Sequence, residues 1–289
     1  MNHLIADNKV STLRAYLSGK LEGIYDARES ASLVQMMFEE FHSWTRTELI
    51  LNAEQRLGES ELLRYHFALK RLLHGEPIQY VLGFGHFLDM KLHTTPAALI
   101  PRPETEELVR LIAATNTLPN PTILDIGTGT GCIAIALKKL LPGAHVQALD
   151  VSKEALELAR TNAEEQEALI GFIQLDIIEQ VPEGTFDIVV SNPPYIPKGE
   201  EHTMSERVTK FEPHVALFTN DSDPWVFYRR LMYLTPSLLT PGGTVFCEIH
   251  ENSAPDLLQL AHDYSITTPV IHTDMQGKNR MMTWQNKPA

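Results

Sequence analysis

The sequence predicts a doubly wound α/β fold, in which helices cover both faces of a mainly parallel sheet, preceded by a small helical bundle. Three observations support this prediction. Strand-like and helix-like segments alternate after about residue 120, residues 1–75 show only helical periodicity, and a length of 289 residues suits two domains. We therefore expect a helical domain over residues 1–75, a hairpin linker over 76–100 and an α/β domain over 101–289.

The N-terminal domain is expected to be helical because its apolar residues recur at the spacing of one helix face. Thr45 and Glu48 have the spacing of a capping box, and Gly75 could end the last helix. The recurring apolar positions are interpreted as bundle core; they are Leu33, Met36, Met37, Phe41, Leu62, Tyr65, Leu69, Leu72 and Leu73.

Residues 76–100 change in character, because Gly83 and Gly85 interrupt aromatic and β-branched residues. This pattern predicts short strands or a hairpin between the two domains. Pro103, followed by acidic residues and then by an apolar periodic segment, predicts the start of a helix.

The second domain is expected to hold a parallel sheet whose ligands bind at the carboxyl ends of the strands. Strands are predicted at residues 122–126, 145–149, 170–175, 186–190 and 243–249, and helices at 133–141, 153–167 and 228–239. Segments 266–272 and 280–285 are expected to close the sheet as an edge pair.

The chain is acidic, with a formal net charge of -13 and a pI of about 5.4. Non-specific DNA binding uses Lys and Arg to neutralise phosphates, so duplex DNA is not the expected partner. No apolar run approaches the roughly 18 residues of a membrane span, and residues 1–9 lack the pattern of a signal peptide. Cys132 and Cys247 have no partner at metal-ligand spacing, so we expect buried thiols, no metal site and a cytoplasmic protein.

A glycine loop, Asp125-Ile-Gly-Thr-Gly-Thr-Gly131, follows one predicted strand and opens the next helix. Its glycines allow a tight turn and close approach of the backbone to a ligand. An NAD loop would have the spacing Gly-x-Gly-x-x-Gly, whereas here position 132 is Cys, so an NAD enzyme is disfavoured. Asp150 ends the next strand about 20 residues further on, where a carboxylate can accept both hydroxyls of a ribose.

The charge beside the loop indicates which nucleoside it binds. Asp125 would repel a pyrophosphate but suits the sulfonium and amino groups of S-adenosylmethionine; the alternative is that it only caps the loop. The glycine loop and Asp150 together predict a Rossmann-like domain that binds S-adenosylmethionine. Ile177, after the third strand, is where the adenine could lie, although an ordinary core position explains it almost as well.

The turn Asn192-Pro-Pro-Tyr195 follows the fourth predicted strand. Pro193 and Pro194 lack backbone donors and stiffen the turn, which leaves the Asn192 side-chain oxygen and the Pro193 carbonyl as acceptors. Two acceptors can hold both N–H groups of a planar NH2 group, and Tyr195 offers a flat face for stacking. We therefore predict methyl transfer to a planar amide or amine nitrogen; a rigid turn without chemistry is the alternative.

The expected reaction is in-line attack of this nitrogen on the sulfonium methyl group. Hydrogen bonds that strengthen as positive charge develops on nitrogen favour the transition state, and positioning at attack distance supplies much of the rest. A strong general base is not needed, so no catalytic His or carboxylate is predicted. The histidines are interpreted as surface or packing groups; they include His86, His202, His214 and His250.

Several segments of the chain resemble those of the HemK-type glutamine methyltransferases, which modify class I peptide chain release factors. The glycine loop alone indicates only a class I methyltransferase, and the Asn-Pro-Pro-Tyr turn narrows the acceptor to an amide or amine nitrogen. The segments that carry the resemblance are 75–80 with Gly83 and Phe87, then 99–106, 125–133, 192–196, 211–217 and 274–280.

This resemblance implies a release-factor-binding helical domain, a hairpin, and a catalytic domain that converts the glutamine of a Gly-Gly-Gln motif into N5-methylglutamine. The implied cofactor contacts are Asp125, Gly127, Thr128, Gly129, Thr130, Gly131, Asp150, Ile177 and Asn192. The implied catalytic and glutamine-holding residues are Asn192, Pro193, Pro194 and Tyr195, with Phe87 and residues 102–106 near the pocket. The chain departs from the family at Ile177, where an aromatic is usual, and over 218–225 and 248–252.

Three alternatives stay open from the residues. A DNA adenine or cytosine methyltransferase shares the logic of the Asn-Pro-Pro-Tyr turn, but it must extract a base and would need a basic domain facing DNA. The acceptor could be another protein glutamine. A cofactor-binding interaction module without turnover is the third.

Overall fold

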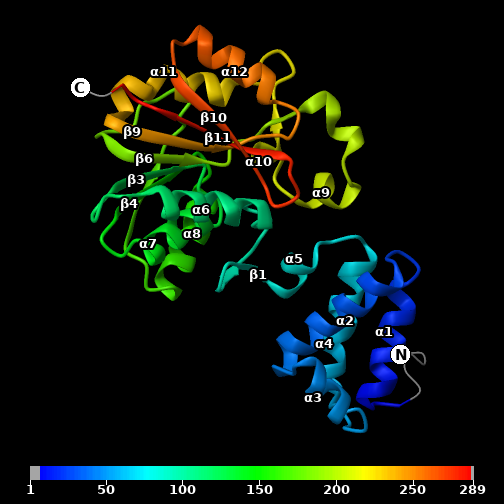
Figure 1. Cartoon of the computed structure of the whole chain (residues 1–289). Helices are drawn as coiled ribbons and strands as arrows, with labels where there is room; N and C mark the ends of the chain where they lie inside the picture. The colour runs from blue at the N-terminus through cyan, green and yellow to red at the C-terminus, as the bar shows by residue number, and fades with distance from the viewer. Residues whose placement is uncertain (1–6, 288–289) are drawn as a thin grey trace. The chain divides into compact units, whose positions relative to one another are not determined.

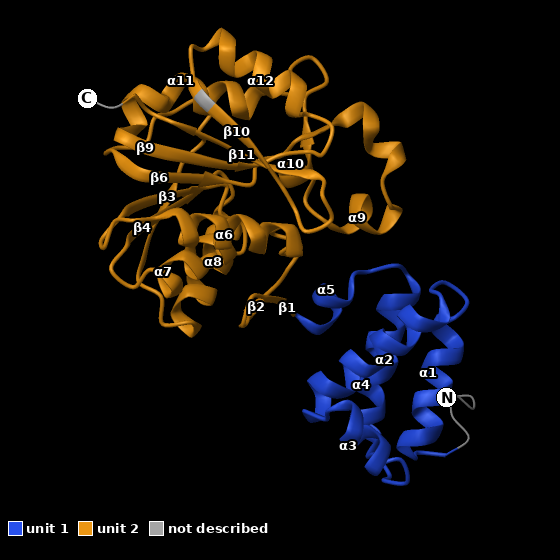
Figure 2. Cartoon of the chain, viewed as in Figure 1, with its two compact units in different colours: residues 1–83 blue, residues 84–289 orange. Residues whose placement is uncertain are grey.

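The computed structural model describes residues 7–287, and the chain forms two compact units, residues 1–83 and 84–289 (Figures 1 and 2). Residues 1–6, where the sequence shows no signal-peptide pattern, and residues 288–289 lie outside the described residues. Within residues 7–287, none of the helices has the length and hydrophobicity that crossing a membrane demands.

The first unit is a helical bundle, as the periodicity predicts. Its helices are α1 (Val10–Leu21), α2 (Ala27–His42), α3 (Arg46–Leu51), α4 (Glu59–Leu73) and α5 (Ile78–Leu82). The apolar stripes meet in one core, in which Met37, Phe38 and Leu72 have no exposed surface. The capping box of α3 is confirmed, because Thr45 N donates to Glu48 Oε2 at 2.8 Å and Glu48 N donates to Thr45 Oγ1 at 3.3 Å.

This unit extends further than the sequence suggests. The sequence places the end of the bundle at residue 75, whereas the first compact unit continues to Gly83. The reason is α5, which buries Ile78 in the bundle core. The hairpin of β1 (Phe84–Phe87) and β2 (Met90–His93) belongs to the second unit.

The second unit is built around one mixed sheet with the strand order β10-β11-β9-β6-β3-β4-β5 (Figure 1). Its parallel strands are β3 (Thr122–Ile126), β4 (His145–Asp150), β5 (Ile170–Gln174), β6 (Phe186–Ser191) and β9 (Leu239–Glu248). An antiparallel pair, β10 (Thr267–Thr273) and β11 (Asn279–Gln285), adds to β9 at one edge. The doubly wound parallel core and the edge pair are thereby confirmed.

Helices cover both faces of this sheet (Figure 1). On one face, a core that includes Leu108 and Ile135 joins the sheet to α6 (Pro103–Thr115), α7 (Cys132–Leu140) and α8 (Lys153–Glu165). On the other, a core that includes Tyr228 and Leu257 joins it to α11 (Val226–Leu238) and α12 (Ala254–Asp263). Helix α6 begins at Pro103 as predicted, whereas α12 was not among the predicted helices.

A long connection leads from β6 to α11. It contains β7 (Ile196–Pro197), the 3₁₀ helix η1 (Lys198–Thr203), α9 (Glu206–Phe211), α10 (His214–Leu217) and β8 (Phe218–Thr219). Because β7 pairs in parallel with β8, the two ends of this connection lie next to each other.

The return of the chain from β5 to β6 positions the candidate site. Strands β4 and β5 extend the sheet on one side of β3, and β6 then pairs with the other side of β3. The loops that follow β3 and β6 therefore leave neighbouring strands in opposite directions. In doubly wound folds, the crevice opened by such a reversal is where ligands bind.

Asn162 on α8 attaches the β1–β2 hairpin to this unit. Its side chain is buried; Nδ2 donates to the carbonyl oxygens of His93 (3.1 Å) and Thr130 (2.9 Å), and Oδ1 accepts from His93 N (2.7 Å). Gln166, one turn later in the chain, donates to Lys91 O of the same hairpin at 3.1 Å through an exposed bond. The hairpin and the glycine loop thus share one buried anchor.

We predict that Asn162→Ala lowers the free energy of unfolding by about 1–3 kcal/mol, because buried backbone groups lose their partners. The matched control Gln166→Ala should change it by less than about 0.5 kcal/mol, since the two bonds it removes, to Lys91 O and from Lys139 Nζ, are both exposed. Urea denaturation of both variants, followed by tryptophan fluorescence, measures the difference. Equal midpoints for the two variants would contradict the role of Asn162 as an anchor.

Candidate active site

The loop between β3 and α7 has a backbone that favours glycine. Gly127, Gly129 and Gly131 have φ angles of +74°, +54° and +82°, in the left-handed region. At Gly131 a Cβ would also lie 3.1 Å from Ile135 Cδ1 and 3.2 Å from Ala159 Cβ. This glycine therefore allows α7 to start in close contact with α8.

Hydrogen bonds hold the loop at the ends of β3 and β4. The backbone N–H groups of Gly127 and Thr128 both donate to Leu149 O, at 2.9 Å and 3.0 Å. The Thr128 hydroxyl donates to Asp125 Oδ2 at 2.6 Å. The loop is thus fixed in shape by the protein alone.

Asp125 lies beneath this loop, with no exposed surface, and does not line the cavity. Burial raises the pKa of its carboxyl group to about 7. One oxygen accepts from Thr128, and the other, Oδ1, has no hydrogen-bond partner among residues 7–287. Asp125 therefore shapes the loop from behind, while its predicted attraction for a cationic ligand stays a prediction.

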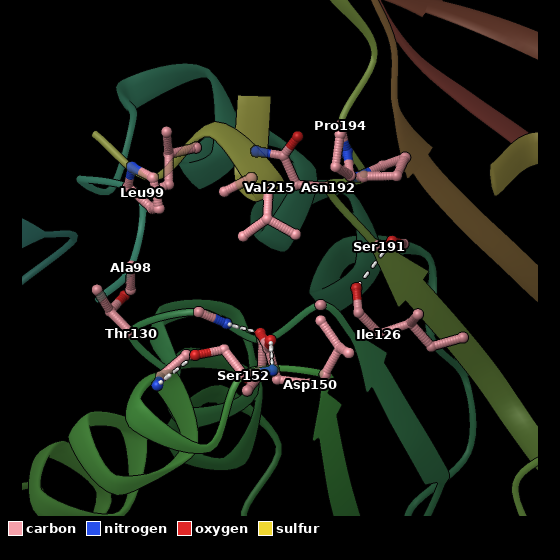
Figure 3. A pocket seen from close by; sticks show the side chains of 18 of the residues that line it. Ala98, Leu99, Ile126, Thr130, Asp150, Ser152, Ser191, Asn192, Pro194 and Val215 are labelled. Atoms are coloured by element: carbon pink, nitrogen blue, oxygen red, sulfur yellow. Dashed lines mark hydrogen bonds between the residues drawn. The ribbon is translucent and has the colours of Figure 1, made fainter. Parts of the chain in front are cut away.

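A cavity of about 270 Å³ opens at the carboxyl ends of β3, β4 and β6 (Figure 3). The glycine loop and the end of β4 form one wall, and the Asn192 turn faces them from another. Further lining comes from the segments before α6 and after β5 and from α10. The lining segments are 97–102, 126–130, 149–152, 175–178 and 191–194, with the single residues Thr105, Cys132, Ile133, Ala155, Pro213, Val215, Ala216 and Phe227.

Asp150 is the acidic group that the cavity presents beside the glycine loop (Figure 3). Its Oδ2 accepts from Gly129 N and its Oδ1 accepts from Ser152 N, both at 2.9 Å. Each oxygen has a further lone pair, so the carboxylate can also accept hydroxyl groups of a ribose. Burial raises the pKa of Asp150 above its usual range. Ile177 also lines the cavity but is only 5% exposed and packs in the core, so its contact with an adenine stays a prediction.

The Asn192 turn is tied to α6. Asn192 Nδ2 donates to Thr105 Oγ1 at 3.2 Å, and both residues line the cavity. With Nδ2 engaged in this way, Oδ1 is the end of the amide that is left for a ligand. The preceding Ser191 donates through its hydroxyl to Ile126 O at 2.8 Å, which joins the turn to β3 (Figure 3).

Behind this turn lies a carboxyl group to which the sequence motifs assign no role in the site. Glu248, at the end of β9, is 2% exposed; its Oε2 accepts from the Thr105 hydroxyl at 2.6 Å and its Oε1 from the Tyr195 hydroxyl at 3.4 Å. Burial raises its pKa to about 7, while the nearby Arg280 and the Thr105 bond act in the opposite direction. An acidic residue at the carboxyl end of a buried strand is the sequence signal that could have identified it.

Two predicted substrate contacts are placed differently by the structure. Phe87 has no exposed surface, packs in the core with Met90 and Leu108 and does not line the cavity, so its contact with the substrate stays a prediction. Tyr195 does not line the cavity and packs against the core beneath α11 and α12. Stacking of Tyr195 on the substrate stays a prediction.

The segment before α6 is held by a buried glutamate to which no sequence pattern assigns a role. Glu212, 3% exposed, accepts from Ile100 N at 3.1 Å and from Arg102 Nη2 at 2.6 Å. Arg102 lines the cavity, as expected for the 102–106 segment. The pair therefore joins the β6–α11 connection to the wall formed by residues 97–102.

The described part of the chain brings neither a histidine nor a metal-binding cluster to this cavity. No histidine of the described chain lines the cavity. Between residues 7 and 287, no cluster of three or more His, Cys, Asp or Glu side chains is placed to hold a metal ion.

The cavity fits the cofactor that the sequence predicts. The backbone of the glycine loop and the Asp150 carboxylate line a site of the kind that binds a nucleoside, the Asp125 carboxyl lies buried beneath that loop, and no basic cluster suited to a pyrophosphate is among the lining residues. Together with the strand order, these features define a class I, S-adenosylmethionine-dependent methyltransferase.

Comparisons with known proteins support this class and also identify the family within it. The methyltransferase small domain family matches residues 105–211, and the PrmC N-terminal domain family matches residues 12–83. The chain is 37% identical over 278 residues to a release factor glutamine methyltransferase of Flavobacterium psychrophilum, covering 94% of this chain and 98% of the relative. It is 36% identical to one of Bacteroides thetaiotaomicron, with 95% and 99% covered. The chain belongs to the release factor glutamine methyltransferase family.

Solved structures agree on the fold. A methyltransferase from Pyrococcus furiosus superposes with a TM-score of 0.51, at 19% identity, over 74% of this chain and 95% of that one. At this identity the likeness concerns the fold alone.

We predict that Asp150→Ala weakens the binding of S-adenosylmethionine by about 10–100-fold, the loss expected for hydrogen bonds to a charged group. Glu154→Ala is the matched control, because it removes the same charge from an exposed position on α8 outside the cavity lining. Isothermal titration calorimetry with both variants gives the dissociation constants. Unchanged affinity in Asp150→Ala would refute the ribose assignment.

Proposed function

We propose that this chain transfers a methyl group from S-adenosylmethionine to the side-chain amide nitrogen of the glutamine in the Gly-Gly-Gln motif of class I peptide chain release factors, forming N5-methylglutamine. The observation that carries this proposal is the orientation of the Asn192 side chain. Asn192 Nδ2 donates to Thr105, so Asn192 Oδ1 is the end that can accept an N–H group of the substrate amide. The relatives that cover nearly the whole chain are named release factor glutamine methyltransferases, which supports the choice of substrate.

When bound, S-adenosylmethionine supplies a methyl group attached to a positively charged sulfur. The loop from Gly127 to Gly131 would hold its amino acid part, and Asp150 would accept from its ribose. Ile177 offers the apolar surface for its adenine. Asp125 would favour the positive charge from beneath the loop.

The glutamine amide is a planar group whose nitrogen is a poor nucleophile, because its lone pair is delocalised. Asn192 Oδ1 and the Pro193 carbonyl oxygen would accept its two N–H groups and orient the nitrogen. These bonds strengthen as the nitrogen gains positive charge, so they stabilise the transition state more than the bound substrate. Pro193 and Pro194 keep the turn stiff, which limits the entropy lost on binding.

No strong base is required for this step, because the amide proton becomes acidic only as the new bond forms. The absence of histidine from the cavity lining of the described chain is compatible with such a reaction. Water or the bulk solvent would take up the proton after transfer.

The helical unit, residues 1–83, would help to bind the release factor. Its match to the PrmC N-terminal domain family supports this assignment. It also exposes apolar side chains, namely Ile50, Leu51 and Phe67, of the kind found at protein interfaces. Since release factors act in translation, we place the enzyme in the cytoplasm.

The test of this proposal is methyl transfer from labelled S-adenosylmethionine to a purified class I release factor, compared with the same factor carrying Gln→Ala in its Gly-Gly-Gln motif. We expect label only in the first. Label in neither, with the cofactor still bound, would reject the release factor as substrate and direct the search to other proteins or to DNA. Equal label in both would show another acceptor site.

Loss of the side-chain oxygen of Asn192 should slow the reaction strongly. We predict that Asn192→Ala lowers kcat by about 10²–10³-fold, the effect of removing one transition-state hydrogen bond. Asn252→Ala, an exposed residue outside the cavity lining, serves as the control and should leave kcat unchanged. Near-normal turnover of the Asn192 variant in steady-state assays would exclude the amide-holding mechanism.

A further inference from the structure

We propose that Thr105 and Glu248 are positioning residues that determine which end of the Asn192 amide faces the substrate. The inference rests on the proposed function and adds two residues to its mechanism. The pair comes from distant parts of the chain: Thr105 lies in the first turn of α6 and Glu248 at the end of β9.

The need for such a device follows from the shape of an amide. The oxygen and nitrogen ends of the Asn192 side chain are nearly equal in size, and a rotation of 180° about the last bond exchanges an acceptor for a donor. Only the oxygen end can accept an N–H group of the substrate. The nitrogen end would place donor against donor and leave the substrate amide unheld.

The Thr105 hydroxyl selects one of these two orientations. A hydroxyl has one hydrogen and two lone pairs, and Thr105 donates its hydrogen to Glu248 Oε2 at 2.6 Å. It can then only accept from the Asn192 side, which it does from Nδ2 at 3.2 Å. A rotated amide would bring Oδ1 against a lone pair, so the Oδ1 end is kept for the cavity.

Glu248 in turn fixes the Thr105 hydroxyl. An ionised carboxylate has no hydrogen to give, so both hydroxyls that contact Glu248, those of Thr105 and Tyr195, must donate to it. Thr105 and Glu248 are each 2% exposed, so water does not compete for these bonds. Two charged side chains act on the pKa of this carboxyl: Arg280 lowers it and so favours the ionised form, and Glu104 raises it.

The network also accounts for a buried carboxyl group at a site that needs no general base. Glu248 does not line the cavity, whereas Thr105 and Asn192 do. Of its two hydroxyl partners, Thr105 and Tyr195, only Thr105 lines the cavity and contacts Asn192, so we assign its effect on the reaction to the route through Thr105. A residue that acts in this way should change kcat without changing the affinity for the cofactor.

A double-mutant cycle on the full chain tests this route, with kcat measured at pH 8 on a release factor. We expect Thr105→Val, which has nearly the same shape without the hydroxyl, to lower kcat about tenfold, with the cofactor dissociation constant within about threefold of the wild type. Thr105→Ser, which retains the hydroxyl, should recover kcat to within about threefold. In the Asn192→Ala background, Thr105→Val should cause no further loss, because the group through which it acts is gone.

Several outcomes would overturn the inference. These are unchanged kcat in Thr105→Val, a Thr105→Ser variant as slow as Thr105→Val, or the same fold loss from Thr105→Val in both backgrounds. A wild-type chain that does not methylate the release factor would overturn the proposed function, and the inference with it. An active wild type with equal losses in both backgrounds rejects the positioning role alone.

If Thr105→Val does not fold, Glu248→Met replaces it in the same cycle, since exchanging a buried charge for an apolar residue of similar volume is often tolerated. Removing the acceptor frees the Thr105 hydrogen to donate toward Asn192, which permits the rotated amide. We again expect about a tenfold loss of kcat that disappears in the Asn192→Ala background. Wild-type kcat in Glu248→Met would overturn the inference.

Discussion

The pairing of β6 with β3 is the constraint on which the site depends. Two strands and their helices separate β3 from β6 in the sequence, yet the sheet places them side by side in parallel. The Ser191 hydroxyl adds a bond to Ile126 O at the ends of these strands. Without this pairing the glycine loop and the Asn192 turn would belong to unrelated surfaces, and no cavity could hold a methyl donor next to an amide.

Two buried carboxyl groups and one half-buried carboxyl group organise the second unit, and each of them has a distinct task. Asp125 shapes the loop through Thr128, Asp150 accepts from the loop and faces the cavity, and Glu248 supports the Asn192 turn through Thr105. Burial raises the pKa of all three, because a charge is costly in a poorly solvated interior. In each case hydroxyl or backbone N–H donors compensate part of that cost.

The proposed reaction depends more on the orientation of the substrate amide than on acid–base catalysis. A glutamine amide has to be held with its nitrogen directed at the methyl group, and the protein offers acceptors on a stiff turn for this purpose. Hydrogen bonds of this kind are effective only if the acceptors cannot reorient, since a mobile amide would lose the preference for the transition state. The bonds from Asn192 to Thr105 and from Thr105 to Glu248 provide that restraint.

The sequence by itself determined the alternation of strands and helices, the glycine loop, the acidic end of β4 and the Asn192 turn, because each of these is a local pattern of neighbouring residues. Tertiary structure alone decided the rest. Thr105 and Glu248 lie 143 residues apart, and Glu212 reaches Arg102 across 110, so no local pattern pairs them. The same holds for Phe87, which the hairpin directs into the core, and for α5, whose Ile78 joins the bundle. Periodicity and spacing report which residues share a face or a turn, whereas contacts between distant elements depend on how those faces pack.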